Sequence, residues 1–493
     1  MSPEIVELLQ TASQLSLMNR DSEAIVAYVR LLEREPALPN SWFNLAGMQR
    51  KARQFDAALA SYQSALDFDV EEPEEVHLKR GVIYSDDLGR SDLALPELEA
   101  ALAHNPDYVP ALLNLGNLRE DRGESELAQQ AYDRALAIQP EHPMALARMA
   151  GLTQLTGLGD PLLARMLAIM TRPGGSSLDR ADLGFALGAA LDRIGAYDAA
   201  FEIYTEANRS SRLFAQTAGQ RYDRKAQERL VDRLIAAFPT GVSATVADDR
   251  DVPIFICGMF RSGSTLVEQV LGRHGEVTAG GELYTLSALI ETRLPNYPDG
   301  LTADNLAALR AAYLADVSLR HLAGTWLTDK RPDNFLHIGL IKTLFPGARI
   351  VHTTRNMLDN CLSVFFLHAA PNLPYAAALA DVAHYYGQQL RLMAHWRAIY
   401  PDIFELDYDA LVADPVPLCR ELLDFCGLAW EDGVLDHRIS AGAIRTASNW
   451  QVRQPLHQGS SGRWRNYRRH LAIDEIVQHA DAAAGGAATA GTV

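Results

Sequence analysis

The sequence predicts two structural parts, an N-terminal α-helical solenoid followed by an α/β domain with a mostly parallel sheet. Three observations predict this fold class. Small and aromatic residues recur with a period close to 34 within the first 140 residues, a short apolar run at 252–257 leads into a glycine-bounded loop, and a helical pattern follows that loop at once. A period near 34 indicates stacked helical pairs. A strand, loop and helix in succession indicate an anion-binding turn of an α/β domain.

Composition limits the classes of protein to which the chain can belong. Its 493 residues suffice for about two to four domains. The net charge of −17 argues against a broadly basic surface for polymeric nucleic acid or acidic membranes, although it permits a local basic pocket. The first residues lack the pattern of a secretory signal, no apolar run is long enough to span a bilayer, and the four cysteines form no CxxC pair. We therefore expect a cytoplasmic protein without a disulfide scaffold.

The repeat is carried by small residues at matching positions. An alanine recurs at spacings of 34, 36 and 34 residues, and a tyrosine or leucine follows each alanine four positions later. The alanines are Ala24, Ala58, Ala94 and Ala128, and the larger residues are Tyr28, Tyr62, Leu98 and Tyr132. A small residue lets two helices approach each other, and the larger side chain fills the groove between them. This pattern resembles the tetratricopeptide repeat.

The resemblance to tetratricopeptide repeats implies a concave surface that binds a peptide or a partner protein. The alternative is that the solenoid only supports the neighbouring domain. A last helical pair around Ala200 and Tyr204 looks like a further unit. We predict a solenoid over 1–212, a helical linker over 213–250, an α/β domain over 251–475 and a low-complexity tail over 476–493.

The loop that follows the apolar run has the composition of a phosphate cradle. Its spacing Gly258-x4-Gly263 matches the nucleotide phosphate loop, but Ser264 stands where that motif has lysine. The missing lysine normally bridges the β- and γ-phosphates, so an ATP or GTP hydrolase fits poorly. Because Arg261 lies inside the loop and no carboxylate partner for magnesium is evident, the loop favours a phosphosulfate donor bound without metal. A kinase-like phosphotransferase that uses the same loop is the alternative.

Several segments together resemble one enzyme family. The loop GMFRSGSTL resembles the 5′-phosphosulfate loop of sulfotransferases that use 3′-phosphoadenosine 5′-phosphosulfate, and the stretch from Arg261 to Glu282 aligns without gaps with tyrosylprotein sulfotransferases. Segments 328–335 and 345–352 follow in the family's order. The resemblance covers about residues 250–470. It implies a P-loop-like α/β sulfotransferase domain that takes this nucleotide as co-substrate, with no metal.

The resemblance also implies catalytic roles. Glu282 matches the family's catalytic glutamate and would act as general base for an acceptor hydroxyl. Lys330 would neutralise charge on the leaving phosphosulfate, and it is one of only five lysines in the chain. Arg261 would contact the same group from within the loop. The alternative is that Glu282 is only an acidic surface residue in a turn.

Donor binding is assigned by the same resemblance. Arg355 and Ser363 match the residues that bind the 3′-phosphate, and Arg355 follows an apolar strand, where open α/β sheets bind ligands. The predicted 5′-phosphosulfate loop consists of Arg261, Ser262, Gly263, Ser264 and Thr265.

The late segment 455–467 resembles the family's loop that closes over the donor. Counting back from the tryptophan places the family's catalytic serine on Gly462, so we assign that role to Ser461 one step away, and donor binding to Arg463. Three histidines, His274, His352 and His368, show no spacing of metal ligands. We expect all three in the core or behind the site, and no metal.

We therefore predict sulfuryl transfer from the phosphosulfate nucleotide to a hydroxyl acceptor. Tyrosine in a peptide is one acceptor, which the repeats could present, and a carbohydrate or small-molecule hydroxyl stays open. The rivals are the kinase-like phosphotransferase and a repeat scaffold whose sulfotransferase domain is degenerate. The expected partners are the nucleotide donor and a peptide or protein bound by the solenoid, without polymeric nucleic acid or membrane. A homodimer is left open.

Overall fold

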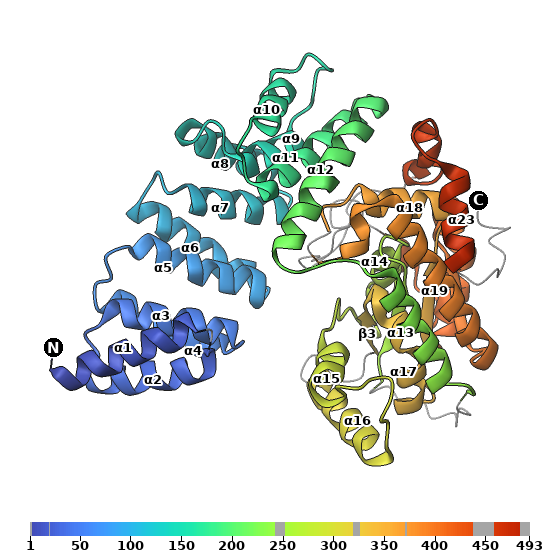
Figure 1. The fold of residues 1–493 in the computed structure, drawn as a ribbon, viewed down its shortest axis with the longest axis horizontal. Coiled ribbons are helices and arrows are strands. Elements are labelled where there is room, and N and C mark those ends of the chain that lie inside the picture. The colour runs from blue at the N-terminus through green and yellow to red at the C-terminus, as the bar shows by residue number, and fades with distance from the viewer. Residues whose placement is uncertain are drawn as a thin grey trace. The chain divides into compact units, whose positions relative to one another are not determined.

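The computed structural model describes residues 2–18, 20–241, 252–318, 326–369, 372–436 and 458–483. It forms two compact units, residues 1–172 and 173–493. Figure 1 shows the first unit as helices and the second as a sheet covered by helices. Within the residues described, no helix is long and apolar enough to cross a membrane.

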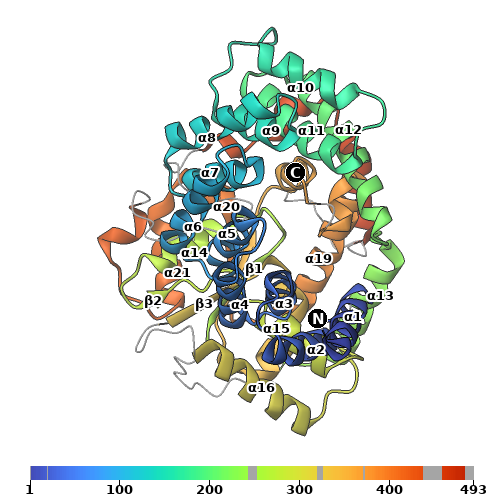
Figure 2. The same ribbon diagram turned by 90° about the vertical axis from the view of Figure 1, so that its left-hand side faces the viewer.

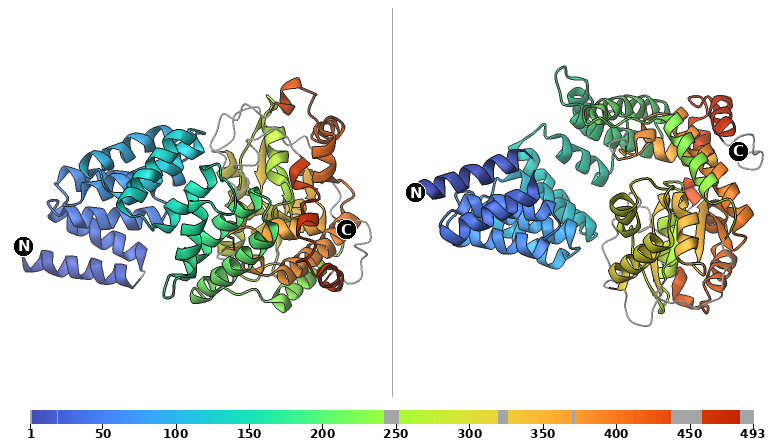
Figure 3. Two further views of the ribbon diagram at one scale, coloured as in Figure 1. Left: turned by 90° about the horizontal axis from the view of Figure 1, so that it is seen from above. Right: turned by 60° about the horizontal axis from the view of Figure 1, so that its bottom comes forward.

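The first unit consists of helices that pair with their neighbours in sequence. α1 packs on α2, α3 on α4, α5 on α6 and α7 on α8, as two further directions of view also show (Figure 3). Proline occupies the first turn of several of these helices, where its missing N–H costs no helical hydrogen bond. The helices are α1 (Pro3–Leu17), α2 (Asp21–Arg34), α3 (Pro39–Lys51), α4 (Phe55–Asp67), α5 (Pro73–Val82), α6 (Ser91–His104), α7 (Val109–Asp121), α8 (Ser125–Ile138), α9 (Pro143–Leu152) and α10 (Pro161–Thr171).

The repeated residues form the contacts between these helices. Each of the four predicted alanines and the four larger residues that follow them is buried. A Cβ added to Gly116 on α7 would lie 2.3 Å from the ring of Tyr132 on α8, so only glycine fits there. The predicted helical solenoid is confirmed for this unit.

A further helical pair opens the second unit. α11 (Ser177–Arg193) packs along α12 (Tyr197–Thr217), and Gly188 meets Tyr204 as Gly116 meets Tyr132. Asn208 Nδ2 on α12 donates to the carbonyl of Phe365 at 2.7 Å, and the ring of Tyr204 stacks on Phe366 with centroids 3.9 Å apart. The pair therefore belongs to the unit 173–493, and the boundary predicted at residue 212 falls inside α12. α13 (Arg224–Ala237) packs on α19, while residues 242–250 of the predicted linker lie outside the described residues.

The sheet is parallel throughout, with strand order β2-β3-β1-β4-β5. Figure 2 shows β2, β3 and β1 in this order. In the register, Ile256 pairs with Lys330 and Cys257 with His352, so the carboxyl ends of β1, β3 and β4 share one edge. The strands are β1 (Ile254–Gly258), β2 (Val277–Thr278), β3 (Trp326–Lys330), β4 (Ile350–Thr354) and β5 (Ile403–Asp407). The predicted α/β domain with a mostly parallel sheet is confirmed.

Helices connect and cover these strands. They are α14 (Ser264–Gly272), α15 (Thr285–Arg293), α16 (Ala303–Ser318), α17 (Ile338–Leu344), α18 (Met357–Phe365), α19 (Leu379–Ile399), α20 (Tyr408–Ala413), α21 (Pro415–Phe425) and α23 (Ile473–Ala483). α23 packs along α19 and buries Ile476 and Ala480, so the tail boundary predicted at 476 falls inside a helix. Residues 484–493 lie outside the described residues.

Candidate active site

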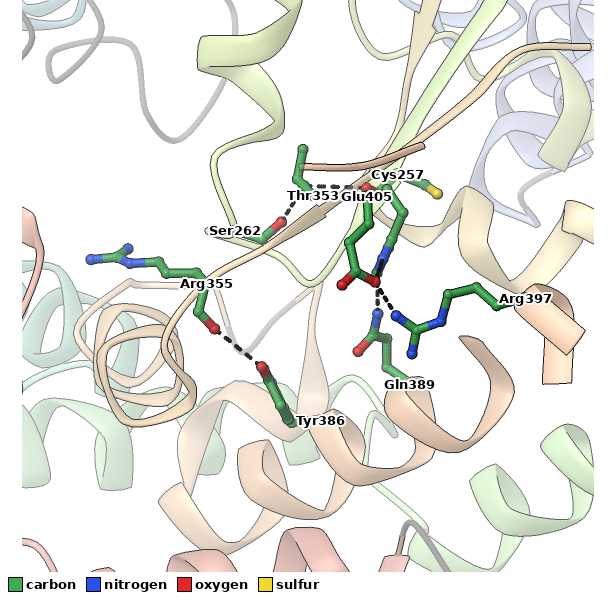
Figure 4. A network of polar contacts seen from close by, with 9 residues as sticks. Cys257, Ser262, Thr353, Arg355, Tyr386, Gln389, Arg397 and Glu405 are labelled. Atoms are coloured by element: carbon green, nitrogen blue, oxygen red, sulfur yellow. Dashed lines mark hydrogen bonds and ion pairs between the residues drawn. The ribbon is translucent and has the colours of Figure 1, made fainter. Parts of the chain in front are cut away.

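The loop between β1 and α14 curls tightly at the carboxyl edge of the sheet. Gly258, Arg261 and Gly263 all have positive φ, at 153°, 70° and 102°. A Cβ on Gly258 would lie 2.4 Å from the carbonyl oxygen of Thr353, so glycine is required at that position. The hydroxyls of Ser262 and Thr353 lie 2.6 Å apart and tie the loop to β4 (Figure 4). The loop thus ends at the N-terminus of α14, which is the arrangement of an anion cradle.

Two arginines and a serine meet behind this loop. Arg261 Nε donates to Ser363 Oγ at 3.1 Å, and Arg355 Nη1 donates to the carbonyl of Arg261 at 3.2 Å. Burial and the charge of Arg355 lower the pKa of Arg261 to about 10. Arg355 Nε is buried and has no hydrogen-bond partner among the residues described. Two guanidinium groups beside an anion cradle, that of Arg355 on a buried residue and that of Arg261 on a half-buried one, fit a multiply charged phosphate ligand.

Glu282 and Lys330 form an ion pair at the same edge. Lys330 Nζ lies 2.6 Å from Glu282 Oε1, with the lysine side chain 1% exposed and the glutamate side chain 36% exposed. Lys330 is the last residue of β3, and its backbone N–H donates to the carbonyl of Gly281 at 3.0 Å. The parallel pairing of β2 with β3 therefore places the loop that carries Glu282 against the end of β3.

Sequence reasoning missed a buried carboxyl group that holds this loop. Glu268 Oε1 on α14 accepts hydrogen bonds from Thr328 Oγ1 at 2.7 Å and from the backbone N–H of Gly281 at 2.9 Å. Burial raises the pKa of the Glu268 carboxyl, while the charge of Lys330 and these hydrogen bonds oppose the rise. The signal in the sequence was an acidic residue within the apolar run of the helix after the loop. Glu268 thus fixes the backbone immediately before Glu282.

A cavity of about 410 Å³ opens beside Glu282. Its polar lining includes Arg331, which forms a two-fold hydrogen bond with Asp333. Much of the remaining lining is aromatic, and the rings of Tyr375 and Tyr385 stack with centroids 4.0 Å apart. The aromatic residues are Phe260, Phe335, Tyr375 and Tyr385, and Gly258 and His368 also line the space. A cavity that combines aromatic walls with convergent polar groups is typical of a small-molecule or side-chain binding site.

Comparison with known proteins agrees with this geometry. Residues 253–432 match the sulfotransferase family, and residues 41–74 and 86–143 match the tetratricopeptide repeat. Residues 253–432 form a sulfotransferase-family domain. The chain therefore combines tetratricopeptide repeats with a sulfotransferase domain.

Individual relatives share the same regions. An uncharacterised protein of Aquifex aeolicus (strain VF5) is 32% identical over 332 residues, which cover 63% of this chain and 43% of that protein. This chain thus spans less than half of that relative. Protein-tyrosine sulfotransferase 1 of Danio rerio is 25% identical over 265 residues, covering 48% of this chain and 72% of the relative. The sulfotransferase domain from the Synechococcus PCC 7002 olefin synthase matches at a TM-score of 0.35 with 19% identity, over 49% of this chain and 98% of that domain.

The late segment 455–467 is described from residue 458, so 455–457 lie outside the described residues. Ser461 Oγ donates to Asp409 at the start of α20. Its neighbour Ser460 accepts a hydrogen bond from Arg355 through its carbonyl oxygen. The segment thus reaches the predicted 3′-phosphate arginine through Ser460, while the Ser461 hydroxyl is bonded to Asp409.

Arg463, to which donor binding was assigned, lies against α11 and Phe366. Its guanidinium forms a 2.6 Å ion pair with Asp192 on α11 and lies 5.3 Å from the centroid of the Phe366 ring. Tyr467 also donates to Asp192. These contacts join the segment 463–467 to α11.

The three histidines have different surroundings. His274 and His352 are buried, as expected, and burial lowers the pKa of His352. Gln389 contacts His352 at 2.6 Å, and Glu405 pairs with Arg397 in the same network behind β4 (Figure 4). His368, by contrast, lines the cavity beside Glu282, which the sequence did not indicate. Among the residues described, no three His, Cys, Asp or Glu side chains are grouped to hold a metal ion.

Proposed function

We propose that this chain transfers a sulfuryl group from 3′-phosphoadenosine 5′-phosphosulfate to a hydroxyl acceptor. The observation that carries the proposal is the Glu282–Lys330 pair at the carboxyl edge of the sheet, since Glu282 lines the same cavity as Gly258 and Phe260 of the phosphate cradle. Arg355 and Ser363 would bind the 3′-phosphate, and the loop 261–265 would bind the 5′-phosphosulfate. The contact of Arg261 with Ser363 supports one continuous donor site.

The reaction needs a proton acceptor and charge compensation. Glu282 would take the proton of the acceptor hydroxyl, whose oxygen forms the new bond to sulfur as the bond from sulfur to the phosphate oxygen breaks. Lys330 would stabilise the negative charge that develops on that phosphate oxygen. The products are a sulfate ester and adenosine 3′,5′-bisphosphate, and the proton stays on Glu282 until solvent removes it. Because Lys330 is almost fully buried, its charge acts in a medium of low dielectric constant.

We infer that the acceptor hydroxyl is a phenol. The aromatic lining of the cavity supports an aromatic acceptor, and the similarity to protein-tyrosine sulfotransferase 1 of Danio rerio supports tyrosine. The tetratricopeptide repeats would then recruit the acceptor protein or a partner. A cytoplasmic location and the oligomeric state stay predictions.

The test measures donor binding and product separately. Adenosine 3′,5′-bisphosphate should raise the melting temperature of the full chain, and mass spectrometry should detect sulfonated tyrosine peptide after incubation with the donor. Glu282→Gln should lower turnover by about 10²–10⁴-fold, as loss of a general base does. Glu291→Gln, an exposed glutamate on α15 bonded to Tyr284, is the control and should retain turnover.

Each rival function has its own outcome in these measurements. A higher melting temperature with Mg-ATP but not with adenosine 3′,5′-bisphosphate would establish the kinase-like phosphotransferase. The chain could instead bind the bisphosphate tightly without turnover of phenol, carbohydrate or alcohol acceptors, and Glu282→Gln could leave these measurements unchanged. That result would establish the repeat scaffold with a degenerate sulfotransferase domain. Sulfonation of a carbohydrate but not of a phenol would overturn the acceptor class alone.

A further inference from the structure

Asp192, near the end of α11, anchors the late segment 458–467 to the last helical pair. Its carboxylate accepts one hydrogen bond from Arg463 Nη2 at 2.6 Å and another from the Tyr467 hydroxyl. The side chains of Asp192 and Arg463 are only 16% and 25% exposed. A charged hydrogen bond that is shielded from water stabilises more than a solvent-exposed ion pair does. Asp192 therefore holds two residues of one short segment.

Aromatic side chains of α12 extend this contact. The buried Tyr467 ring lies 5.4 Å from the Tyr197 ring and 6.2 Å from the Phe201 ring, measured between centroids. His470 stacks on Phe201 with centroids 4.8 Å apart. Aromatic pairs at such distances stabilise beyond the area that they bury. The helical pair α11–α12 thus forms a packed surface for residues 463–470.

The other end of the late segment orients Arg355. The carbonyl oxygen of Ser460 accepts a hydrogen bond from Arg355 Nη2, and the carbonyl oxygen of Arg261 in the phosphate cradle accepts one from Nη1 at 3.2 Å. Both acceptors are backbone carbonyls, which orient a guanidinium without neutralising its charge. The positive charge of Arg355 therefore stays available for a phosphate group, and its position depends on where the segment places Ser460.

The stretch between Ser460 and Arg463 has little freedom to shift. The carboxylate of Asp359 on α18 accepts a hydrogen bond from the backbone N–H of Gly462 and another from that of Trp464 at 2.8 Å. These two residues flank Arg463, and Ser460 is three positions before it. Because the backbone of this stretch is held, an anchor at Arg463 also helps to place Ser460.

We propose that Asp192 is a positioning residue for the donor, because it keeps Ser460 against Arg355 by holding Arg463. This inference rests on the proposed function and deepens it, since it makes the last helical pair part of the site for the 3′-phosphate. Arg463 then acts through Asp192 and does not contact the donor. Direct binding of the donor by Arg463 would have the opposite consequence, because Asp192 would compete with the donor for the guanidinium.

The test measures donor affinity in single and double variants. Adenosine 3′,5′-bisphosphate is titrated calorimetrically into the full chain. Asp192→Ala and Arg463→Ala should each weaken binding about tenfold, the loss of one shielded charged hydrogen bond. The double variant should bind no more weakly than either single variant, because both substitutions remove the same contact. Asp192→Asn, which keeps an acceptor oxygen, should recover part of the loss. With 4-methylphenol as acceptor, Asp192→Ala should raise the donor KM and leave the acceptor KM unchanged.

Asp182 on the same helix provides a matched control. Its carboxylate lies 2.8 Å from His368 Nδ1, and His368 lines the cavity beside Glu282 instead of contacting the late segment. Asp182→Ala should therefore leave the Kd of the bisphosphate unchanged. The melting temperature of each variant, measured without ligand, reports the loss of stability separately from the loss of affinity.

Several outcomes would overturn the proposal. One is a lower melting temperature in Asp192→Ala with an unchanged Kd, which would make the contact purely structural. Another is an equal loss of affinity in Asp182→Ala. Weaker binding in Arg463→Ala with unchanged or tighter binding in Asp192→Ala would make Arg463 a direct donor ligand, and so would additive losses in the double variant. Failure of the wild type to bind the bisphosphate would instead overturn the proposed function.

Discussion

The repeats of residues 1–172 and the parallel sheet of the second unit bury different kinds of side chain. In the repeats, the buried positions hold mostly alanine and larger apolar side chains or tyrosine, and among the residues described the buried charged side chain is Asp160, which caps the N-terminus of α10. At the carboxyl edge of the sheet, Lys330, Arg355 and Glu268 are buried, and so is Asp329 on β3. Burying charge is unfavourable unless each group is paired. Burial in the repeats therefore serves helix packing, whereas the sheet edge buries charged side chains at a cost in stability, as the proposed site requires.

The two buried lysines of the second unit test whether burial alone makes a lysine important for activity. Lys330→Ala should lower turnover by about 10²–10³-fold, because in the proposed reaction it removes the group that stabilises the leaving phosphate oxygen. Lys342, equally buried on α17, donates to Asp402 and to the carbonyl of Ala348, each at 2.7 Å. Lys342→Ala should lower the melting temperature and leave kcat close to wild type. Equal losses of kcat in the two variants would show that Lys330 has only a structural role.

Two aspartates, Asp329 in the second unit and Asp160 in the repeats, should change the free energy of unfolding in opposite directions as pH rises. Burial raises the pKa of Asp329 to about 7, although Tyr313 and Asn334 donate hydrogen bonds to it. Its folded pKa exceeds its unfolded value of 3.8, so its contribution to stability is full below that value and is lost as pH rises through about 7. Asp329→Asn should therefore gain up to about 4 kcal/mol over wild type between about pH 4 and pH 8, measured by urea unfolding.

Asp160 in the repeats provides the contrast. Backbone N–H groups of Thr156 and Leu162 lower the pKa of its carboxyl, so its stabilisation is present above the unfolded pKa and is lost as pH falls. Asp160→Asn should therefore lose stability relative to wild type at neutral pH and approach it in acid. If both variants changed with the same sign, the contrast between the backbone hydrogen bonds that Asp160 accepts and the desolvation of Asp329 would be wrong.

The smallest expected difference concerns two equivalent glycine–tyrosine contacts. A Cβ on Gly116 would lie 2.3 Å from Tyr132, and one on Gly188 would lie 2.8 Å from Tyr204. Each Gly→Ala variant should lose about 1–3 kcal/mol by overpacking, measured by thermal unfolding. Only Gly188→Ala should also raise the acceptor KM, because Tyr204 stacks on Phe366 beside the cavity wall. A raised acceptor KM in Gly116→Ala would show that the effect on acceptor binding is not specific to the α11–α12 contact.

Local patterns predicted much of the fold. The spacing of Ala24, Ala58, Ala94 and Ala128 indicated the helical pairs, because a helix contact depends on residues a few turns apart. The loop from Gly258 to Gly263 was recognisable because its glycines and the following helix are consecutive in the chain. The individual roles of Glu282, Lys330, Arg355 and Ser363 came from resemblance and stay predictions, although the structure brings Glu282 to Lys330 and Arg261 to Ser363.

The sequence alone therefore determined the two kinds of architecture and the position of the anion cradle. Only the tertiary structure decided that α11 and α12 join the second unit, that Glu268 holds the loop before Glu282, and that Asp182 meets His368. Asp182 and His368 are 186 positions apart, and no periodicity links them. Helical and loop patterns arise from neighbouring residues, whereas the partner of a buried charge is set by which distant elements pack together.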